Sequence, residues 1–520
     1  MRKWMPLLAV CLGTFMLLID VTIVSVALPQ MTDSLDASFT ALQWVVDIYV
    51  LVLAALLMAI GSLSDHVGSR RVYLIGLAVF AAASLACGLA DSSAQLIVAR
   101  GVQGLGAAAM FATNTALLAS NYQGRDRGIA FGMWGAVNGA AAAAGPILGG
   151  LLTEHVNWRW IFFVNLPVAA LALVIGHRHL KGSPSGTGRR IDVPGTVGFT
   201  AAATLLIFAL IHAGEDGWGS TTTLALFAGS AVALVVFFLV ERSRQDPMLD
   251  LKLLRSPSFG GLLAGAVVFS AAAFANLVFV SVWAQSVLDL SPVEAGLILM
   301  PLSGMSFVAA GLAGRFLSSA APQWPIGAGL LLIGLGTLLE MRLTATSGWT
   351  ALLPGMLLTG IGVGIASPIL ASAALAAAPA NRAGMAGGAA NTFRQLGFAI
   401  GIPVVGAILT GAIGRELSDS GLFADSDSAA ELVTGGQSAR LIAELPSGAR
   451  EAGERTIEQA YSTGLDQAFL VSGVAAVLAG ALVLILVRRS PVPSDVVETG
   501  QETGQEIGPQ RSAESPKPVA

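Results

Sequence analysis

Long apolar stretches recur along the whole chain, separated by shorter segments that carry most of the charge. A helix needs about 20 mainly apolar residues to cross the hydrocarbon core of a bilayer. By that criterion we predict fourteen spans, over residues 6–28, 43–62, 72–90, 94–117, 129–152, 160–178, 194–213, 221–240, 259–284, 293–317, 326–343, 350–371, 384–411 and 467–487. Only 12% of the residues are charged, against about 25% in an ordinary soluble domain. The chain is therefore predicted to be an all-α integral membrane protein.

The positive charges are distributed unevenly between the two sides of the predicted membrane. Of the 28 Lys and Arg residues, two fall inside spans and two in the C-terminal tail. Six lie on the side opposite the N-terminus, namely Arg159, Arg342, Arg415, Arg440, Arg450 and Arg455, which leaves 18 on the N-terminal side. Cytoplasmic loops are the ones enriched in Lys and Arg. We therefore expect a multi-pass protein of the plasma membrane with both termini in the cytoplasm.

Two segments outside the predicted spans are long. Residues 412–466 form a predicted external loop with ten acidic residues and four arginines. Within this loop, residues 439–461 have the apolar spacing of a helix, interrupted by Pro446 and Gly448. Residues 489–520 are rich in Pro, Ser, Gly and Glu, and this composition predicts a disordered cytoplasmic tail.

Four ionisable residues fall inside predicted spans: Asp20, Asp47, Arg100 and Arg394. A charge at the centre of a span costs roughly 2.5–3.5 kcal/mol by insertion scales, so such residues are usually tied to function. Desolvation favours a neutral carboxyl group, whereas a nearby guanidinium favours the charged form. An Asp that alternates between these surroundings can carry a proton, and Asp20, in the middle of its span, suits that role. Arg100 is the candidate cation that modulates it.

Asp47 and Arg394 are candidates for contact with the substrate or a cation. Asp47 lies about one helical turn inside the outer end of its span, where it can meet water or a cationic substrate. The alternative, for these two residues and for Asp20 alike, is a structural ion pair that fixes helix packing.

The segment between the second and third spans reads Gly61-Ser-Leu63-Ser-Asp65-His-Val-Gly68-Ser-Arg70-Arg71. It resembles the loop signature of the major facilitator superfamily and matches at each of its main positions. The resemblance implies a cytoplasmic gate formed by Gly61, Asp65, Gly68, Arg70 and Arg71, with Asp65 meeting the start of the thirteenth span. The alternative for the two arginines is ordinary positive charge on a cytoplasmic loop.

Spans 4 and 5 carry the same resemblance. Span 4 contains Arg100-Gly-Val-Gln103-Gly104-Leu-Gly106, similar to a second motif of the superfamily, in which the arginine is assigned to proton transfer. Span 5 contains Gly135, Gly139, Gly145, Pro146, Gly149 and Gly150, similar to the motif described for exporters. Small residues at such spacing let helices pack closely, and Pro146 is expected to kink its span.

Two further stretches narrow the resemblance to the fourteen-span drug:proton antiporter family. Residues 18–29 read Leu-Ile-Asp-Val-Thr-Ile-Val-Ser-Val-Ala-Leu-Pro, and residues 158–167 read Trp-Arg-Trp-Ile-Phe-Phe-Val-Asn-Leu-Pro. The resemblance implies two six-helix bundles of the major facilitator type, over residues 1–180 and 256–488, with two inserted helices within 181–255. There are two departures from the family pattern. Asp47 stands where many relatives carry an uncharged residue, and residues 311–315 copy the first gate without its Asp, which predicts a less electrostatic second gate.

The chain is not expected to use ATP. A phosphate-binding Walker loop needs Gly-Lys followed by Ser or Thr, and none of the four lysines follows a glycine. A proton gradient remains as the energy source. We therefore hypothesise proton-coupled export of amphipathic or cationic small molecules, such as drugs or antibiotics, by alternating access. The alternative is a dedicated exporter of a single self-made antibiotic or metabolite.

Other function classes have less support. An enzyme would need His, Asp or Cys gathered near one membrane interface, and His177 and His179 instead lie among basic residues. Cys11 and Cys87 lie within apolar runs, so we expect neither a disulfide nor a metal site. The absence of a dense basic patch argues against nucleic-acid binding. The expected partners are a small-molecule substrate, protons and the lipid bilayer, with no cofactor and a monomeric chain.

Overall fold

The structure is a computed structural model that describes residues 2–35, 39–182, 192–215, 217–244, 247–317, 319–341, 343–344, 346–379 and 382–487. The predicted tail 489–520 lies outside these residues. Every regular element in the described ranges is a helix, which confirms the predicted all-α fold.

The first half of the chain and the insertion contain nine α-helices. After the short η1 (Arg2–Trp4), they are α1 (Met5–Leu35), α2 (Phe39–Val67), α3 (Ser69–Gly88), α4 (Ser93–Asn121), α5 (Gly124–His155), α6 (Trp160–Phe163), α7 (Asn165–His179), α8 (Val193–Glu215) and α9 (Thr221–Ser243).

The second half begins with the short α10 (Leu251–Leu254). It continues with α11 (Pro257–Ser270), the π-helical turn η2 (Ala271–Ala275), α12 (Asn276–Ser286), α13 (Pro292–Ile298), α14 (Met300–Phe316), α15 (Gln323–Leu339), η3 (Trp349–Leu352), α16 (Leu353–Ala376), α17 (Ala383–Ser420), α18 (Ser426–Thr434), α19 (Ser438–Glu444) and α20 (Arg450–Leu486).

Twelve of the fourteen predicted spans coincide with helices that are long and apolar enough to cross a membrane among the described residues. The other two, 129–152 and 326–343, fall on α5 and on α15. The helix α15 is apolar but only 17 residues long, and α5 is not among the twelve. The structure therefore shows a multi-span helical membrane protein, and the count of fourteen stays a prediction.

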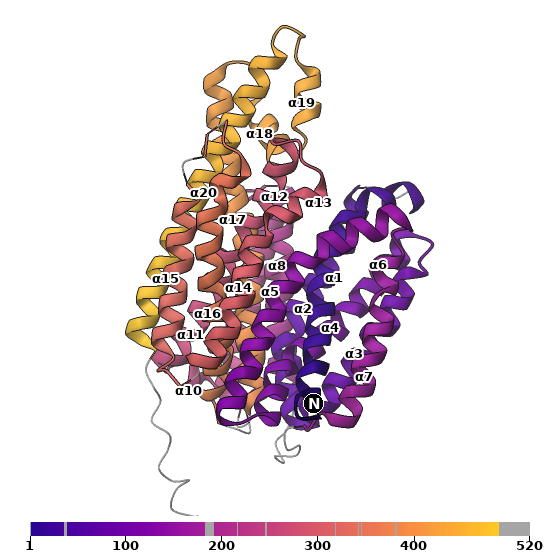
Figure 1. Ribbon diagram of the computed structural model, residues 1–520, viewed down its shortest axis with the longest axis vertical. Helices are drawn as coiled ribbons and strands as arrows, with labels where there is room; N and C mark the ends of the chain where they lie inside the picture. Colours follow the sequence, from indigo (N-terminus) through magenta and orange to yellow (C-terminus); the bar gives the residue numbers. More distant parts are fainter. Residues whose placement is uncertain are drawn as a thin grey trace, which may run out of the picture. The chain divides into compact units, whose positions relative to one another are not determined.

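The segment predicted as an external loop, 412–466, is mostly helical, and the gap between α19 and α20 falls at Pro446 and Gly448, where the helical spacing of 439–461 is interrupted. α17 continues to Ser420, α20 begins at Arg450, and α18 and α19 lie between them. Apolar residues keep helical spacing past the predicted ends of the spans, so Ile413 and Leu417 of α17 and Tyr461 of α20 are fully buried. Hydropathy misses these turns because their outer faces are charged. Figure 1 shows α18 and α19 at the opposite end of the helices from the labelled N-terminus.

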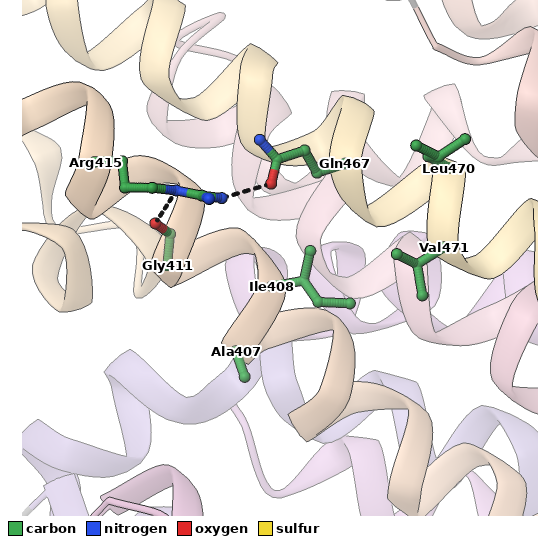
Figure 2. Close-up of a pocket in the computed structure, with 7 residues that line it drawn as sticks. All are labelled: Ala407, Ile408, Gly411, Arg415, Gln467, Leu470 and Val471. Atoms are coloured by element: carbon green, nitrogen blue, oxygen red, sulfur yellow. Dashed lines mark hydrogen bonds between the residues drawn. The ribbon is translucent and has the colours of Figure 1, made fainter.

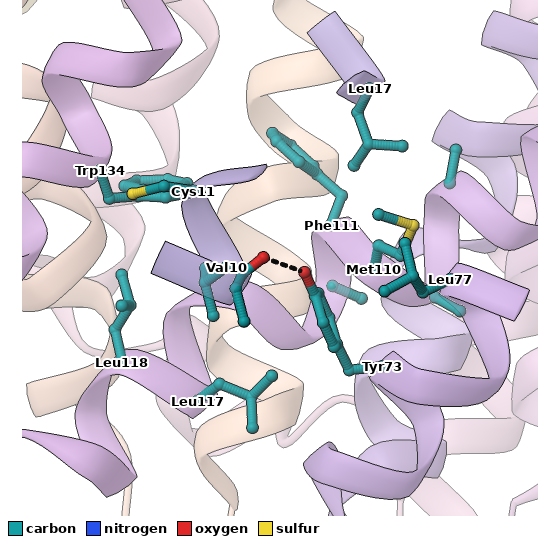
Figure 3. Close-up of a cluster of buried hydrophobic side chains, with 14 of the residues drawn as sticks. Val10, Cys11, Leu17, Tyr73, Leu77, Met110, Phe111, Leu117, Leu118 and Trp134 are labelled. Atoms are coloured by element: carbon teal, nitrogen blue, oxygen red, sulfur yellow. Dashed lines mark hydrogen bonds between the residues drawn. The ribbon is translucent and has the colours of Figure 1, made fainter. Parts of the chain in front are cut away.

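Within the first half, α3 packs against α4, α2 against α4, and α1 against both α5 and α7. Glycine allows the backbones of α3 and α4 to approach each other closely. A Cβ atom placed on Gly106 of α4 would lie 2.6 Å from the backbone N of Phe80 and 2.8 Å from the carbonyl O of Gly76, both in α3. Figure 3 shows Tyr73 of α3 directed at the backbone of α1, where its hydroxyl donates to the carbonyl O of Ala9 at 2.8 Å. Small residues and one buried hydroxyl thus join three helices.

The most extensive contacts between the two halves of the chain join α5 to α14 (Figure 1) and α2 to α17. The inserted helix α8 contacts both α2 and α17 as well as its partner α9. Leu51 and Ala54 of α2, Ile207 of α8 and Leu396 of α17 belong to one apolar cluster. The insertion therefore lies against the line where the two halves meet.

The close contact of α3 and α4 generates a prediction about stability. Gly106→Ala is expected to lower the midpoint temperature of thermal unfolding in detergent, because overpacking a tight contact typically costs about 1–3 kcal/mol. The matched control is Gly311→Ala in α14, where an added Cβ would have nothing within 4 Å. Equal midpoints for the two variants would contradict the observed helix contact.

Candidate functional site

Asp20 of α1 and Arg100 of α4 form an ion pair in which both side chains are fully buried. The Arg100 Nη1 atom donates to Asp20 Oδ2 and also to Gln103 Oε1, at 2.8 Å for the second bond. Its Nε atom donates to the carbonyl O of Val45 in α2 at 2.9 Å. The structure therefore brings the two predicted proton-coupling residues into direct contact.

Three neutral residues complete this arrangement. Gln103 Nε2 donates to Asp20 Oδ1 at 2.8 Å, and Asn165 Nδ2, at the start of α7, donates to the same oxygen at 3.1 Å. The hydroxyl oxygen of Ser84 in α3 accepts from Gln103 at 2.9 Å and from Asn165 at 3.4 Å. We call Asp20, Ser84, Arg100, Gln103 and Asn165 the Asp20 cluster. It joins α1, α3, α4 and α7 through hydrogen bonds that are closed to solvent.

Aromatic rings cover the guanidinium of Arg100. Its Cζ atom lies 4.1 Å from the ring centroid of Tyr49 and 5.9 Å from that of Phe162. The Tyr49 hydroxyl donates to the carbonyl O of Leu17 at 3.3 Å, which fixes the ring against α1. A cation over an aromatic face is stabilised by the ring quadrupole, and more strongly where water is excluded. The rings therefore help to hold a buried positive charge.

The predicted site residues did not include Gln103, Asn165, Ser84 or Tyr49. Gln103 follows Arg100 by three residues, which places both side chains on one face of α4, and Asn165 lies in the distinctive stretch 158–167. Those two had a detectable signal. A serine in an apolar helix and a tyrosine in the next span carry no sign of their partners, because the contacts depend on the tertiary fold.

In this geometry both carboxylate oxygens of Asp20 are engaged. Oδ2 accepts from a guanidinium and Oδ1 accepts from two amide groups. Adding a proton to Asp20 would remove the ionic contact with Arg100 and leave the guanidinium to Gln103 and Val45.

Asp47 and Arg394 lie outside the Asp20 cluster. Asp47 is partly buried in α2, between Val45 and Tyr49, which both contact Arg100. Arg394 belongs to α17, and its guanidinium lies 5.2 Å from the ring centroid of Phe269 in α11. Its buried Nη1 atom has no hydrogen-bond partner among the described residues. The structure thus separates this cation, in the second half of the chain, from the ion pair in the first half.

Asp65 meets the start of α17, as the family resemblance implied. Its two carboxylate oxygens accept from the backbone N–H groups of Gly384 and Met385, at 2.7 and 2.9 Å. The first N–H groups of a helix lack partners within the helix and carry partial positive charge, so they suit a carboxylate. Beside them, a Cβ atom on Gly61 would lie 2.6 Å from the carbonyl O of Gly384 and 2.9 Å from the Cα of Gly388.

The other residues of this hairpin, Gly68, Arg70 and Arg71, contact the first half of the chain or face outward. Gly68 precedes α3 with a φ of 98°, in the left-handed region that favours glycine. Arg70 Nη2 donates to the carbonyl O of His177 at the end of α7, at 2.6 Å. Arg71 is exposed. Arg70 therefore fastens the hairpin to α7.

The glycines of α5 face both halves of the chain. A Cβ atom on Gly145 would lie 1.8 Å from the hydroxyl oxygen of Thr22 in α1. On the other side of α5, Gly139 lies against Ser303 and Ser306 of α14, and Gly150 lies against Val293 of α13. Gly149 is buried, and the side chain of Pro146 lies outside the described residues.

A further close contact joins α5 to α14. A Cβ atom on Gly132 would lie 2.8 Å from the Cα of Gly314, and one on Gly314 would lie 2.4 Å from the carbonyl O of Gly128. Gly314 belongs to the predicted copy of the hairpin that lacks an Asp. The backbones of α5 and α14 are therefore in contact there without a carboxylate in the position that Asp65 has in the first hairpin.

A groove of about 690 Å³ lies between α17 and α20, away from all the predicted site residues (Figure 2). Its walls include Ile408, Leu470 and Val471. At its rim Arg415 donates to Gln467 Oε1 at 2.8 Å and to the carbonyl O of Gly411 at 3.1 Å. The groove belongs to the surface of the second half and does not reach the Asp20 cluster.

The many spans, the helix contacts between two halves and the buried polar cluster belong to a polytopic membrane protein, and a family comparison gives its class. The sequence model of the Major Facilitator Superfamily matches residues 10–402. The chain belongs to that superfamily and is a protein of the plasma membrane.

Two relatives are named for resistance. The chain is 35% identical over 507 residues to the tetracenomycin C resistance and export protein of Streptomyces glaucescens, an alignment that covers 94% of this chain and 93% of the relative. It is 36% identical over 406 residues to the multidrug resistance protein Stp of Mycobacterium tuberculosis, covering 78% of this chain and 75% of the relative. The relatives are thus antibiotic and multidrug resistance proteins.

A solved structure shares the fold. The human organic anion transporter MFSD10 (TETRAN) superposes with a TM-score of 0.61 at 15% sequence identity, over 92% of this chain and 99% of that chain. At this identity the likeness concerns the fold alone.

The buried ion pair generates a prediction about stability. Arg100→Met is expected to lower the midpoint temperature of thermal unfolding in detergent, because removing one partner of a buried pair costs about 3–5 kcal/mol. Adding Asp20→Asn to Arg100→Met should recover part of that loss, since no uncompensated charge then stays buried. A double variant that is as unstable as the single one would rule out the pairing.

Proposed function

We propose that this chain exports amphipathic or cationic small molecules, such as drugs or antibiotics, in exchange for protons. The observation that carries the proposal is the Asp20–Arg100 ion pair, in which both side chains are fully buried. The resistance functions named for the relatives support export. The chain acts as a monomer with fourteen spans and with both termini in the cytoplasm.

The proton acts by competing with Arg100 for Asp20. When the cluster opens to the outside, a proton neutralises Asp20, and the guanidinium keeps only its bonds to Gln103 and Val45. When it opens to the cytoplasm, the proton leaves and the ion pair forms again. Each proton that enters supplies about 1.4 kcal/mol per pH unit and about 2.3 kcal/mol per 100 mV. These amounts suffice to concentrate a substrate outside the cell.

Alternating access is proposed to occur between two six-helix units, residues 1–180 and 256–488, with 181–255 as the insertion. The gate consists of Gly61, Asp65, Gly68, Arg70 and Arg71 on one unit and the start of α17 on the other. Asp65 holds the gate closed through its two bonds to backbone N–H groups. The glycines of α5 give the units a smooth surface on which to move.

Asp47 and Arg394 are the proposed substrate contacts. Asp47 is partly buried next to the segment that holds Arg100, so a cationic substrate bound there would act on the same helix as the proton. One buried nitrogen of Arg394 lacks a partner among the described residues, and the Phe269 ring covers its guanidinium. An oxygen-rich or anionic group of a substrate can satisfy that nitrogen.

A dedicated exporter of one antibiotic is the second candidate. The relative that aligns over 94% of this chain is named for the export of, and resistance to, a single compound, tetracenomycin C. Breadth of substrate therefore separates the two candidates, while the proton step is common to both.

Proton coupling can be tested in everted membrane vesicles that hold an acid-inside gradient, followed with a pH-sensitive dye. Wild-type protein is expected to dissipate the gradient when a substrate is added, and Asp20→Asn should reduce this response to background, because an amide carries no proton. The matched control is Asp419→Asn, an exposed acidic position, which should respond as wild type does. A full response from Asp20→Asn would overturn the proposal.

The same assay measures the breadth of substrates. Responses to several unrelated cationic dyes indicate a multidrug exporter. A response to one compound alone favours the dedicated exporter.

The gate can be tested by alkylation in everted vesicles. Ala389 of α17 is fully buried, so Ala389→Cys, made after Cys11 and Cys87 are replaced by alanine, should react slowly with an impermeant maleimide. Adding Asp65→Ala should raise the rate by about tenfold or more, since hydrogen bonds to a charged group contribute about 1.5–3 kcal/mol each. Asp65→Asn, which keeps one acceptor oxygen, should give an intermediate rate. Unchanged rates would contradict the gate.

A further inference from the structure

The inserted helices carry two buried acidic residues at one end. Asp192 immediately precedes α8 and is 7% exposed, and Glu241 lies in the last turn of α9 and is 2% exposed. Both carboxyl groups converge on Gly195. A Cβ atom on that glycine would lie 2.5 Å from Asp192 Oδ2 and 2.8 Å from Glu241 Oε1. The absence of a side chain at Gly195 leaves the space that the two groups share.

The partners of this pair do not balance two negative charges. Asp192 Oδ1 accepts from the backbone N of Gly195 at 2.9 Å, and the Arg244 Nε atom lies 3.9 Å from the same oxygen with its side chain 48% exposed. Glu241 Oε1 accepts from the backbone N of Leu249 at 3.3 Å. The other two oxygens, Asp192 Oδ2 and Glu241 Oε2, are buried without a hydrogen-bond partner among the described residues.

The surroundings of the pair are α8, α9 and the segment 247–250. Arg244 is the charged group that these elements bring to the pair among the described residues, whereas Asp250 is engaged by Arg382. One half-exposed guanidinium, in ion-pair contact with Asp192 alone, therefore faces two buried carboxyl groups. Burial and a like charge both favour the neutral form of a carboxyl group.

We propose that Asp192 and Glu241 hold one proton between them and form a protonation site on the inserted helices, separate from Asp20. The shared proton removes one of the two negative charges and supplies a donor for one of the two unpartnered oxygens. The remaining charge is balanced by Arg244 and the backbone N–H groups. The site takes a proton and needs no other ligand.

This site is connected to the start of α17. Glu241 accepts from Leu249, which is 3% exposed and packs in one apolar cluster with Met385 of α17. The next residue, Asp250, forms an ion pair with Arg382, which directly precedes α17. The first N–H groups of α17 in turn bind Asp65. These contacts connect Asp192 and Glu241 to the start of α17, which Asp65 binds.

Loss of the shared proton would place two negative charges side by side in a buried space. They can separate only if the ends of α8 and α9 move apart, which loosens the bond between Glu241 and Leu249. The segment 247–250 then holds Arg382 less firmly. A rise in pH on this side of the membrane would thus loosen the start of α17.

The proton itself can be observed by infrared spectroscopy of the purified full-length protein, without any transport. A protonated carboxyl group gives a band distinct from that of a carboxylate. At neutral pH, Asp192→Asn and Glu241→Gln should each lose the same band, because either change leaves one carboxyl group that ionises against Arg244. Glu431→Gln, at an exposed position, is the matched control and should keep the band. Retention of the band in either variant of the pair would overturn the proposal.

The connection to α17 can be observed by hydrogen exchange of peptides that cover residues 383–390. After correction for intrinsic rates, raising the pH through neutrality should speed exchange in the wild type by about tenfold, a size typical of local opening. Glu241→Gln should abolish this dependence, Asp192→Asn should do the same, and Glu431→Gln should keep it. The same pH dependence in wild type and in both variants of the pair would refute the connection. Neither readout depends on whether Asp20 couples protons to transport.

Discussion

Backbone contact at glycine holds the helices of this chain together. Lipid is as apolar as the side chains it meets, so burial alone does not drive helices to associate within a membrane, and close packing takes over that role. Between the halves, Gly61 meets Gly384, and Gly132 meets Gly314. Contacts of this kind are close but have no interlocking side chains. Two surfaces joined in this way can separate without repacking a core, as the proposed alternating access would require.

Because these glycine surfaces do not interlock, specific polar bonds are needed to hold the two halves in one arrangement. At the contact of α2 and α17, that bond is the capture of two backbone N–H groups by Asp65. At the contact of α5 and α14 the described residues show backbone packing where the related hairpin lacks an acid. The two contacts therefore differ in their chemistry. A change in charge can act on the contact of α2 and α17 through Asp65, whereas the contact of α5 and α14 depends on the fit of the two backbones.

Several of these features were predictable from the sequence, and physical reasons separate them from the others. Asp20 and Arg100 stand out because a charge inside a membrane span needs a partner, and the family resemblance implied that Asp65 meets the start of α17. The role of Ser84 was not predictable, because a serine costs little in a helix and its partners come from other helices. The extension of α17 to Ser420 was missed because a hydropathy window averages over the charged outer face of an amphipathic turn.

Predictions about single charges were less complete than predictions about pairs. Asp47 and Arg394 were identified by the same reasoning as Asp20, yet the fold brings neither into the Asp20 cluster. A sequence shows that a buried charge must be compensated, but the compensating group depends on which helices meet. For Arg394 it includes an aromatic ring. For Arg100 it is a carboxylate, two rings and two carbonyl oxygens, one of them from the backbone.

The requirement that a buried charge be compensated also applies to the insertion. Helices α8 and α9 are inserted between the two halves in the sequence, yet α8 contacts both α2 and α17, the two helices that Asp65 joins. An element in that position would bias the proposed gate only through a group that changes between states. Apolar packing does not change with the proton gradient, whereas the proton proposed for Asp192 and Glu241 would be lost as the pH rises. That proton would therefore give the insertion a means to act on the proposed gate that its apolar faces cannot provide.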